Sequence, residues 1–86
     1  MPVVKFYAGL RQITGVKEKN IPGDSLRVIL EALRSDFPAI QAYLFSGDRV
    51  RAIITLNGQA IDPNTALEKP VSGNDMIAIF PPIGGG

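Results

Sequence analysis

The sequence contains no cysteine and no histidine among its 86 residues. Without them the chain has no thiolate nucleophile, no imidazole base and no thiolate or imidazole metal ligand. The eight acidic residues are scattered without the spacing of a metal-binding loop, so we predict no metal site. Because these absences remove most of the chemistry of a self-sufficient enzyme, we expect the protein to be acted upon by partner enzymes.

The sequence also lacks long hydrophobic runs and a large net charge. No apolar stretch approaches the ~18 residues of a membrane span, and residues 1–10 lack the layout of a signal peptide. Since nothing in a cysteine-free chain points to an oxidising compartment, we expect a cytoplasmic protein with no membrane partner. Nine basic residues against eight acidic ones leave a net charge of +1, which disfavours nucleic acid as a partner.

What is present is the composition of one globular domain, with 45% hydrophobic residues. Alternating apolar residues predict strands at 3–8 and 51–58, and a charged edge strand at about 16–21. In the strand at 3–8, the side chains of Val4, Phe6 and Ala8 share one face. In the strand at 51–58, those of Ala52, Ile54 and Leu56 point inward. Asn57-Gly58 favours a tight turn, with a short strand at 59–61 after it. The last strand, 76–80, is apolar on both faces and is therefore expected at the centre of the sheet.

One strong helical pattern lies between these strands. Apolar residues recur at helical spacing, Asp24 or Ser25 is placed to cap the N-terminus, and the helix must stop before Pro38; the apolar residues are Leu26, Ile29, Leu30, Leu33 and Phe37. A short second helix is expected through Ile40, Tyr43 and Leu44, closing near 46–48. The order predicts an α+β fold with a mixed four- to five-stranded sheet and one main helix on one face. A ubiquitin-like β-grasp fits this order, as do several other small α+β folds.

The sequence closes on "IFPPIGGG", residues 79–86. Pro81 and Pro82 have no amide hydrogen, so the last strand cannot extend past Phe80, and we divide the chain into a domain at 1–82 and a flexible glycine tail at 83–86. The tail adds a reach of roughly 13–14 Å, and glycine, lacking a Cβ, enters slots too narrow for other residues.

A carboxylate at Gly86 is inert until it is activated. Transfer to the α-phosphate of ATP by a partner enzyme gives an acyl adenylate, which sulfur, a thiol or an amine can attack. A linker remnant or disordered end is the alternative for terminal glycines. We favour the reactive tail, because its glycines follow a strand and a Pro-Pro pair and the chain ends there.

Both ends of the chain resemble a known family. "FYAGLRQITG" is similar to the opening of the small subunit of molybdopterin synthase, and "SGNDMIAIFPPIGGG" resembles its close. "SLRVILEALRSDFP" is similar to its helix. The chain is thus identified as a member of the MoaD/ThiS-type ubiquitin-like sulfur carriers. Two departures, Gly84 before the diglycine and "SGND" in place of an Asp-Gly-Asp turn, leave the terminal spacing intact.

The resemblance implies a β-grasp fold and a sulfur carrier. It implies that a ubiquitin-activating-type adenylyltransferase uses ATP to adenylate Gly86, which then becomes a thiocarboxylate, while Ile83, Gly84 and Gly85 enter the partner. No cofactor is bound by the carrier itself. The expected role is the small subunit of molybdopterin synthase in molybdenum cofactor biosynthesis, with the large catalytic subunit as partner. Alternatives are a carrier for cysteine or thiamine biosynthesis, a ubiquitin-like modifier joined to lysines through Gly86, and an interaction module with an idle tail.

The resemblance also implies partner-binding residues near the tail: Tyr7, Arg11, Phe80, Pro81 and Pro82. Alternation places Tyr7 opposite Phe6, and Phe80 opposite Ile77 and Ile79, so both rings are expected on the sheet face away from the helix. Plain core positions for both rings, and a merely solvated loop position for Arg11, remain the alternatives.

Overall fold

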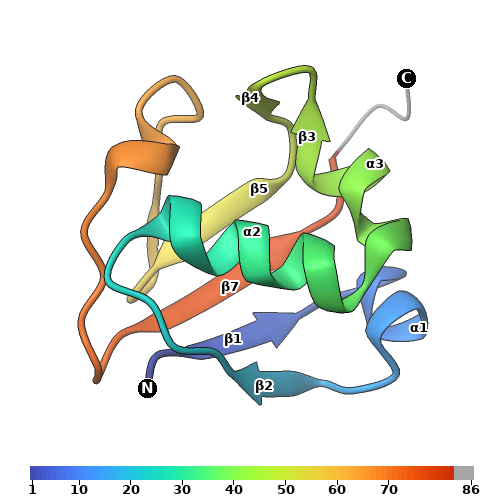
Figure 1. Cartoon of the computed structure of the whole chain (residues 1–86), viewed down its shortest axis with the longest axis horizontal. Coiled ribbons are helices and arrows are strands. Elements are labelled where there is room, and N and C mark those ends of the chain that lie inside the picture. Colours follow the sequence, from blue (N-terminus) through green and yellow to red (C-terminus); the bar gives the residue numbers. More distant parts are fainter. Residues whose placement is uncertain (83–86) are drawn as a thin grey trace.

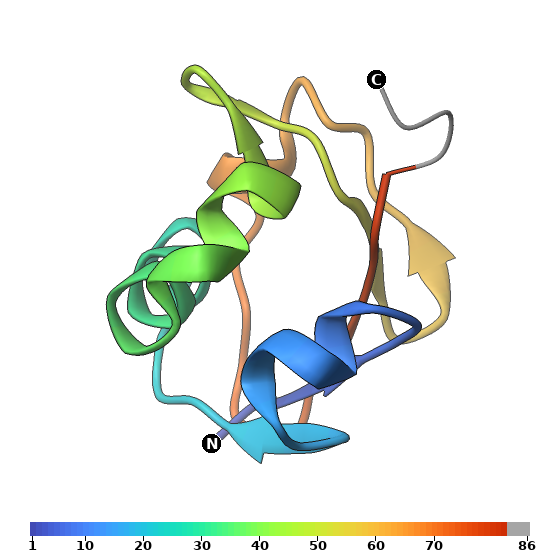
Figure 2. The same cartoon turned by 90° about the vertical axis from the view of Figure 1, so that its right-hand side faces the viewer.

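The computed structural model describes residues 1–82, which form a five-stranded sheet with helix α2 lying across one face (Figure 1). The predictions for Ile83, Gly84, Gly85 and Gly86 lie outside the described residues. The strands stand in the order β2-β1-β7-β5-β6; they are β1 Val3–Phe6, β2 Glu18–Asn20, β5 Ile53–Leu56, β6 Gln59–Ala60 and β7 Met76–Phe80. Figure 2 shows α2 on one side of this sheet. The predicted α+β class is confirmed.

Strand β7 occupies the centre of the sheet, as its two apolar faces predict. It runs parallel to β1, with Phe6 opposite Ile79, and antiparallel to β5, with Ile54 opposite Ile79 on the other side. The sheet is therefore mixed. Within residues 1–82 strand β2 pairs only with β1, and all its residues are exposed, which confirms the predicted edge strand at a shorter length.

Helix α2 spans Leu26–Asp36 and buries its apolar side against the sheet. Of the two candidate caps the structure selects Ser25, whose Oγ accepts a hydrogen bond of 3.2 Å from the backbone N–H of Val28. The helix ends before Pro38, as predicted, with the N–H of Phe37 bonded to the carbonyl of Leu33. The core residues beneath it are wholly or almost wholly buried; they include Leu26, Ile29, Leu30 and Leu33 from the helix and Val4, Phe6, Ile54, Ile77 and Ile79 from the sheet.

The second helix is shorter than predicted. A 3-10 turn η1 at Pro38–Ile40 runs into α3 at Gln41–Leu44, and the chain then forms a two-stranded ribbon of β3 Phe45–Ser46 and β4 Arg49–Val50. Gly47 turns this ribbon with φ of 65°, a conformation that glycine adopts without strain. The predicted turn at 46–48 is thus present, and the two short strands around it are an addition. A further 3-10 turn, η2 Ala66–Glu68, buries Ala66 within the connection.

Three predicted boundaries are wrong. The first strand ends at Phe6, because Ala8 is exposed and takes a φ of 52°, which breaks the alternation. The stretch after it is helix α1, Leu10–Thr14, which is not among the elements predicted from the sequence; Leu10 is wholly buried and anchors it. The strand predicted at 51–58 is β5, which begins only at Ile53. The short strand predicted at 59–61 is β6, which stops before Ile61. That turn has positive φ at Asn57 and Gly58, as predicted.

A hydrogen-bonded cluster of side chains ties this turn to the start of β7. Asn57 Nδ2 donates to Asp75 Oδ1 over 2.9 Å, and the N–H of Met76 donates to Asn57 Oδ1 over 2.9 Å. The N–H of Ser72 donates to Asp75 Oδ2 over 2.8 Å. The Asn57 amide and then the Ser72 N–H hold the pKa of Asp75 below its ordinary value of 3.8, because both donors favour the carboxylate.

We predict that Asp75→Asn destabilises the domain at neutral pH and that its deficit shrinks in acid. The folded-state pKa lies below the unfolded one, so the carboxylate contributes its full stability above 3.8 and loses it as the pH falls through the lowered folded-state pKa. Urea unfolding of both proteins from about pH 7 downward measures this difference. The pH dependence should weaken in an Asn57→Ala background, and an equal deficit at every pH would contradict the prediction.

Candidate functional site

The rings of Tyr7 and Phe80 stack on each other at one end of the sheet. Their centroids are 4.5 Å apart and their planes differ by 14°. The parallel register explains the contact: Phe6 lies opposite Ile79, so the next residue on each chain comes alongside, and the Tyr7 N–H donates to the Ile79 carbonyl over 3.2 Å. Phe6 and Ile79 are wholly buried under α2, whereas Tyr7 and Phe80 are half-buried and stand outside the core.

Arg11 joins this pair from helix α1. Its Nε donates to the Phe6 carbonyl over 2.9 Å, and its guanidinium carbon lies 5.4 Å from the centroid of the Tyr7 ring. An arginine at this distance from an aromatic face makes a cation–π contact, and its remaining N–H groups stay available because the residue is exposed. We call Arg11, Tyr7 and Phe80 the aromatic stack. The solvated loop position considered for Arg11 is replaced by a helical one with two fixed contacts.

Ile53 extends the aromatic stack across a third strand. It pairs with Phe80 in the β5–β7 register and is 37% exposed, so Tyr7, Phe80 and Ile53 form one row on the face away from α2. Sequence reasoning missed Ile53, although its alternation with the inward-facing Ala52 and Ile54 was a signal for an outward apolar residue. Farther along the same face of β7 lies Met76, which is also exposed. This face therefore offers an apolar surface next to the end of β7.

Pro81 and Pro82 leave the sheet beside the aromatic stack. Strand β7 ends at Phe80, as the missing amide hydrogens predict, and both prolines are half-buried. The structure thus brings Tyr7, Arg11, Phe80 and the two prolines to the same end of β7. Residue 83, where the predicted tail begins, follows directly.

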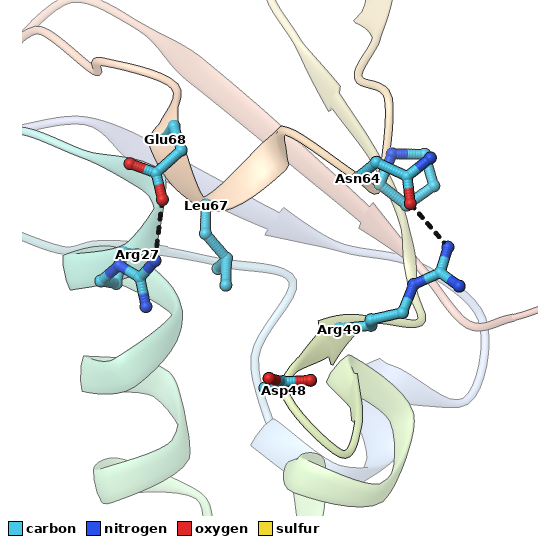
Figure 3. Close-up of a pocket in the computed structure, with 7 residues that line it drawn as sticks. Arg27, Asp48, Arg49, Asn64, Leu67 and Glu68 are labelled. Carbon is cyan, nitrogen blue, oxygen red and sulfur yellow. Dashed lines mark hydrogen bonds and ion pairs between the residues drawn. The ribbon is translucent and has the colours of Figure 1, made fainter.

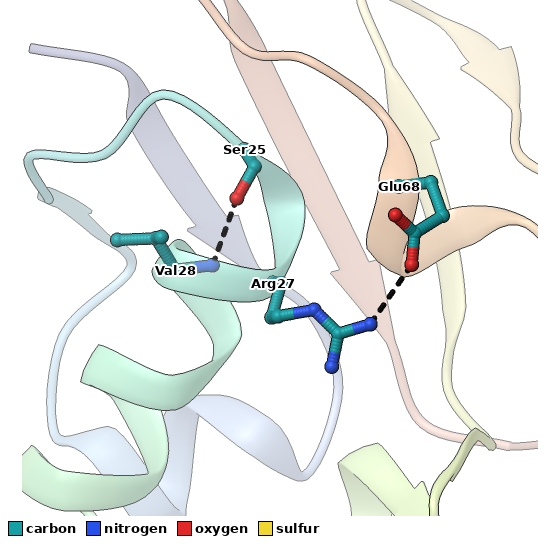
Figure 4. Close-up of polar contacts among 4 residues, drawn as sticks. All are labelled: Ser25, Arg27, Val28 and Glu68. Carbon is teal, nitrogen blue, oxygen red and sulfur yellow. Dashed lines mark hydrogen bonds and ion pairs between the residues drawn. The ribbon is translucent and has the colours of Figure 1, made fainter.

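A separate pocket of about 310 Å³ lies between α2, the β3–β4 ribbon and η2 (Figure 3). Arg27 Nη2 pairs with Glu68 Oε1 at 2.9 Å on one side, next to the Ser25 cap (Figure 4). On the other side Arg49 Nη2 donates to Asn64 Oδ1 over 2.8 Å. Both of its arginines are thus paired with other lining residues, and none of the sequence-predicted site residues lines the pocket. We assign it no role.

Residues 1–82 contain no helix that is long and apolar enough to cross a membrane. Among the same residues, no three acidic side chains gather closely enough to hold a metal ion.

Comparison with known proteins places this geometry in a family. The model of the ThiS family matches residues 4–86, so the chain belongs to the ThiS family. The fold is accordingly the ubiquitin-like β-grasp, and the chain is a ubiquitin-like protein of the sulfur carrier and modifier type. Carriers of this type are small and non-catalytic. A comparison with curated protein sequences gave no significant match.

Solved structures agree with this assignment. The small archaeal modifier protein 1 of Methanosarcina acetivorans is 30% identical, with a TM-score of 0.84 over 99% of this chain and 95% of that one. The BexX/CysO complex of Amycolatopsis orientalis matches at 24% identity and a TM-score of 0.85, covering 100% of both chains. The complex of molybdopterin-converting factor subunits 1 and 2 from Helicobacter pylori matches at 24% identity and a TM-score of 0.67. The match covers 99% of this chain and 97% of that one. The latter two support the fold alone, and both are complexes with a partner protein.

We predict that Tyr7 and Phe80 stabilise the free domain cooperatively. In a double-mutant cycle with Tyr7→Leu and Phe80→Leu, the stacked pair should show a coupling energy of about 0.5–1.5 kcal/mol, because both singles break the same contact. Urea unfolding measures each free energy. Tyr43→Leu serves as the control, since Tyr43 lies on α3 outside the aromatic stack, and its effect should add to that of Phe80→Leu. Simple additivity of the Tyr7 and Phe80 changes would mean that the rings stack without stabilising the domain.

Proposed function

We propose that this protein is a sulfur carrier whose terminal glycine, Gly86, is adenylated and then converted to a thiocarboxylate. The observation that carries the proposal is the membership of the ThiS family over residues 4–86, a match that includes the diglycine tail. The aromatic stack supports it, because an apolar surface at the root of this tail offers a partner enzyme a place to dock.

The proposed chemistry uses one carbon of this chain and a partner's active site. A carboxylate oxygen of Gly86 attacks the α-phosphorus of ATP and pyrophosphate leaves. Sulfide then attacks the carbonyl carbon and gives up its proton to solvent base, the bond from that carbon to the AMP oxygen breaks, and AMP leaves, so that sulfur replaces one oxygen of the carboxylate. ATP is bound by the partner, a ubiquitin-activating-type adenylyltransferase, and this protein acts as co-substrate. Ile83, Gly84 and Gly85 enter the partner's channel, where the absence of a Cβ on the glycines permits a narrow fit.

We assign the docking of partners to Tyr7, Phe80, Arg11, Pro81 and Pro82. Aromatic and arginine side chains are enriched at binding hot spots, and here they stand together on an uncovered part of the sheet within the described chain. The Arg11 guanidinium suits a carboxylate on the partner, while the rings and prolines suit an apolar surface. The same face then meets the activating enzyme and the sulfur acceptor in turn.

For the acceptor we propose the large catalytic subunit of molybdopterin synthase, acting in the cytoplasm. The support is the similarity of residues 6–15 and 72–86 to the two ends of that enzyme's small subunit. A second candidate is a ubiquitin-like modifier conjugated to lysines through Gly86, which the 30% identity to the small archaeal modifier protein 1 favours. Carriers for cysteine or thiamine biosynthesis use the same activated tail.

We predict that deleting Gly86, or adding one alanine after it, abolishes activation and leaves the fold intact. The reaction needs a free carboxylate at one fixed distance from the domain. The assay is the intact mass of the protein after incubation with ATP, the activating enzyme and a sulfur source. Replacement of one carboxylate oxygen by sulfur raises this mass. An extended protein that still gains sulfur without being trimmed would refute the tail chemistry. Conjugates on lysines in place of a thiocarboxylate would select the modifier function.

We predict that Phe80→Ala weakens binding to the activating enzyme by ~2 kcal/mol or more, because a central aromatic anchor is lost from the interface. Isothermal titration calorimetry measures the change, and Val28→Ala is the matched control. Val28 is an exposed apolar residue, but it lies on α2, on the opposite side of the sheet. If the melting temperature collapses while the remaining folded protein binds normally, Phe80 is a stability residue and the docking assignment fails.

A further inference from the structure

The Asn57-Gly58 pair supplies both reacting groups of asparagine deamidation, a spontaneous reaction: the Asn57 side-chain amide and the Gly58 backbone nitrogen. An asparagine followed by glycine loses its side-chain amide most readily, because no Cβ hinders attack by the glycine nitrogen on the asparagine Cγ. Gly58 is exposed in the β5–β6 turn, and its N–H donates no hydrogen bond within residues 1–82. The nucleophile for this reaction is therefore open to solvent.

The electrophile, in contrast, is held at both of its polar atoms. Nδ2 of Asn57 donates to Asp75 over 2.9 Å, and Oδ1 accepts from the Met76 N–H over 2.9 Å. The backbone N–H of Asn57 donates to the Met76 carbonyl over 2.8 Å, so two hydrogen bonds fix the residue to the first residue of β7 and a third fixes it to the preceding Asp75. The Asn57 Cγ cannot turn toward the Gly58 nitrogen until the side-chain bonds break.

We propose that Asn57 is a latent deamidation site that Asp75 and β7 hold in its amide form. When the side chain is released, the Gly58 nitrogen gives its proton to solvent base and bonds to Cγ. The bond from Cγ to Nδ2 breaks, ammonia leaves, and a succinimide forms. Water then opens the ring at Cγ to give aspartate, or at the Asn57 backbone carbonyl to give isoaspartate. No redox step or cofactor is involved.

Conversion changes the charge of the cluster that secures β7. The donor at Nδ2 is replaced by a carboxylate oxygen facing Asp75, so an attraction becomes a repulsion between like charges. Isoaspartate also adds one backbone carbon to a turn whose two residues require positive φ. Either product weakens the tie between the β5–β6 turn and the start of the strand that leads to Phe80. Slow deamidation at Asn57 would thus destabilise the start of the central strand as the protein ages. This effect is independent of the proposed sulfur chemistry.

The first experiment compares deamidation rates by peptide mass mapping at mildly alkaline pH. Asp75→Ala should deamidate at Asn57 roughly fivefold faster than the natural sequence, as expected for loss of an exposed charged partner. The control is Val50→Ala, a core change on β4 that destabilises the fold elsewhere and should not accelerate the reaction to that extent. Internal references are two asparagines that precede residues with a Cβ and are not next to the substituted position, Asn20 and Asn64.

Equal rates in the natural sequence and in folded Asp75→Ala, or equal acceleration by Val50→Ala, would overturn the protection by Asp75. The natural protein should also react more slowly folded than in urea, and an equal rate would likewise overturn the proposal.

The second experiment exchanges the two side chains. Asn57→Asp, the product of the reaction, should lower the melting temperature. Asn57→Asp combined with Asp75→Asn should recover most of the loss, because the carboxylate at 57 can accept from the Met76 N–H and from an amide at 75, whose oxygen can accept from the Ser72 N–H. A double variant no more stable than Asn57→Asp alone would show that the pair does not secure β7.

Discussion

The pairing of β7 with strands on both sides is the constraint on which the rest of the structure depends. Its inward residues, Ile77 and Ile79, are wholly buried beneath α2, and each such side chain contributes about 1.5–3 kcal/mol by leaving water. Strands β1 and β5 do not pair with each other, so β7 is their only link within the described sheet. With no disulfide available, the domain relies on this one strand to hold both halves of the sheet under the helix.

The direction of β7 decides where the candidate site forms. Because β7 is parallel to β1, both strands finish at the same end of the sheet, and Tyr7 arrives next to Phe80. An antiparallel pairing would place Tyr7 beside the start of β7. The turn after β1 then leads into α1, which returns Arg11 to the Phe6 carbonyl and the Tyr7 ring. The site is therefore a consequence of topology, assembled from residues more than seventy positions apart in the chain.

Sequence patterns predicted the elements that have enough residues to show a period. Helix α2 repeats its apolar side over three turns and meets Pro38, and β7 is apolar on both faces, so both were found. Helix α1 has five residues between Gly9 and Gly15, too few to show a helical period, so the sequence pattern predicts no helix there. Alternation along each strand was enough to predict that the side chains of Tyr7 and Phe80 lie on the outer face of the sheet. Their stacking could not be predicted, because it depends on the parallel register of β1 and β7. The bond between Asn57 and Asp75 joins residues 18 positions apart and leaves no local signal.

The two ends of β7 are secured by opposite means. At its start, polar side chains and backbone N–H groups bond the strand to the β5–β6 turn. At its end the following prolines can donate no ladder bond, so the pairing with β5 stops at the Ile53–Phe80 pair and the stacked ring of Phe80 adds a side-chain contact there. Full burial of that residue would hold it best, but would leave no surface beside the start of the tail. A half-buried Phe80, stacked on Tyr7 and paired with the exposed Ile53, packs one face of its ring and leaves the rest of its surface uncovered, which is the arrangement that the proposed docking of a partner requires.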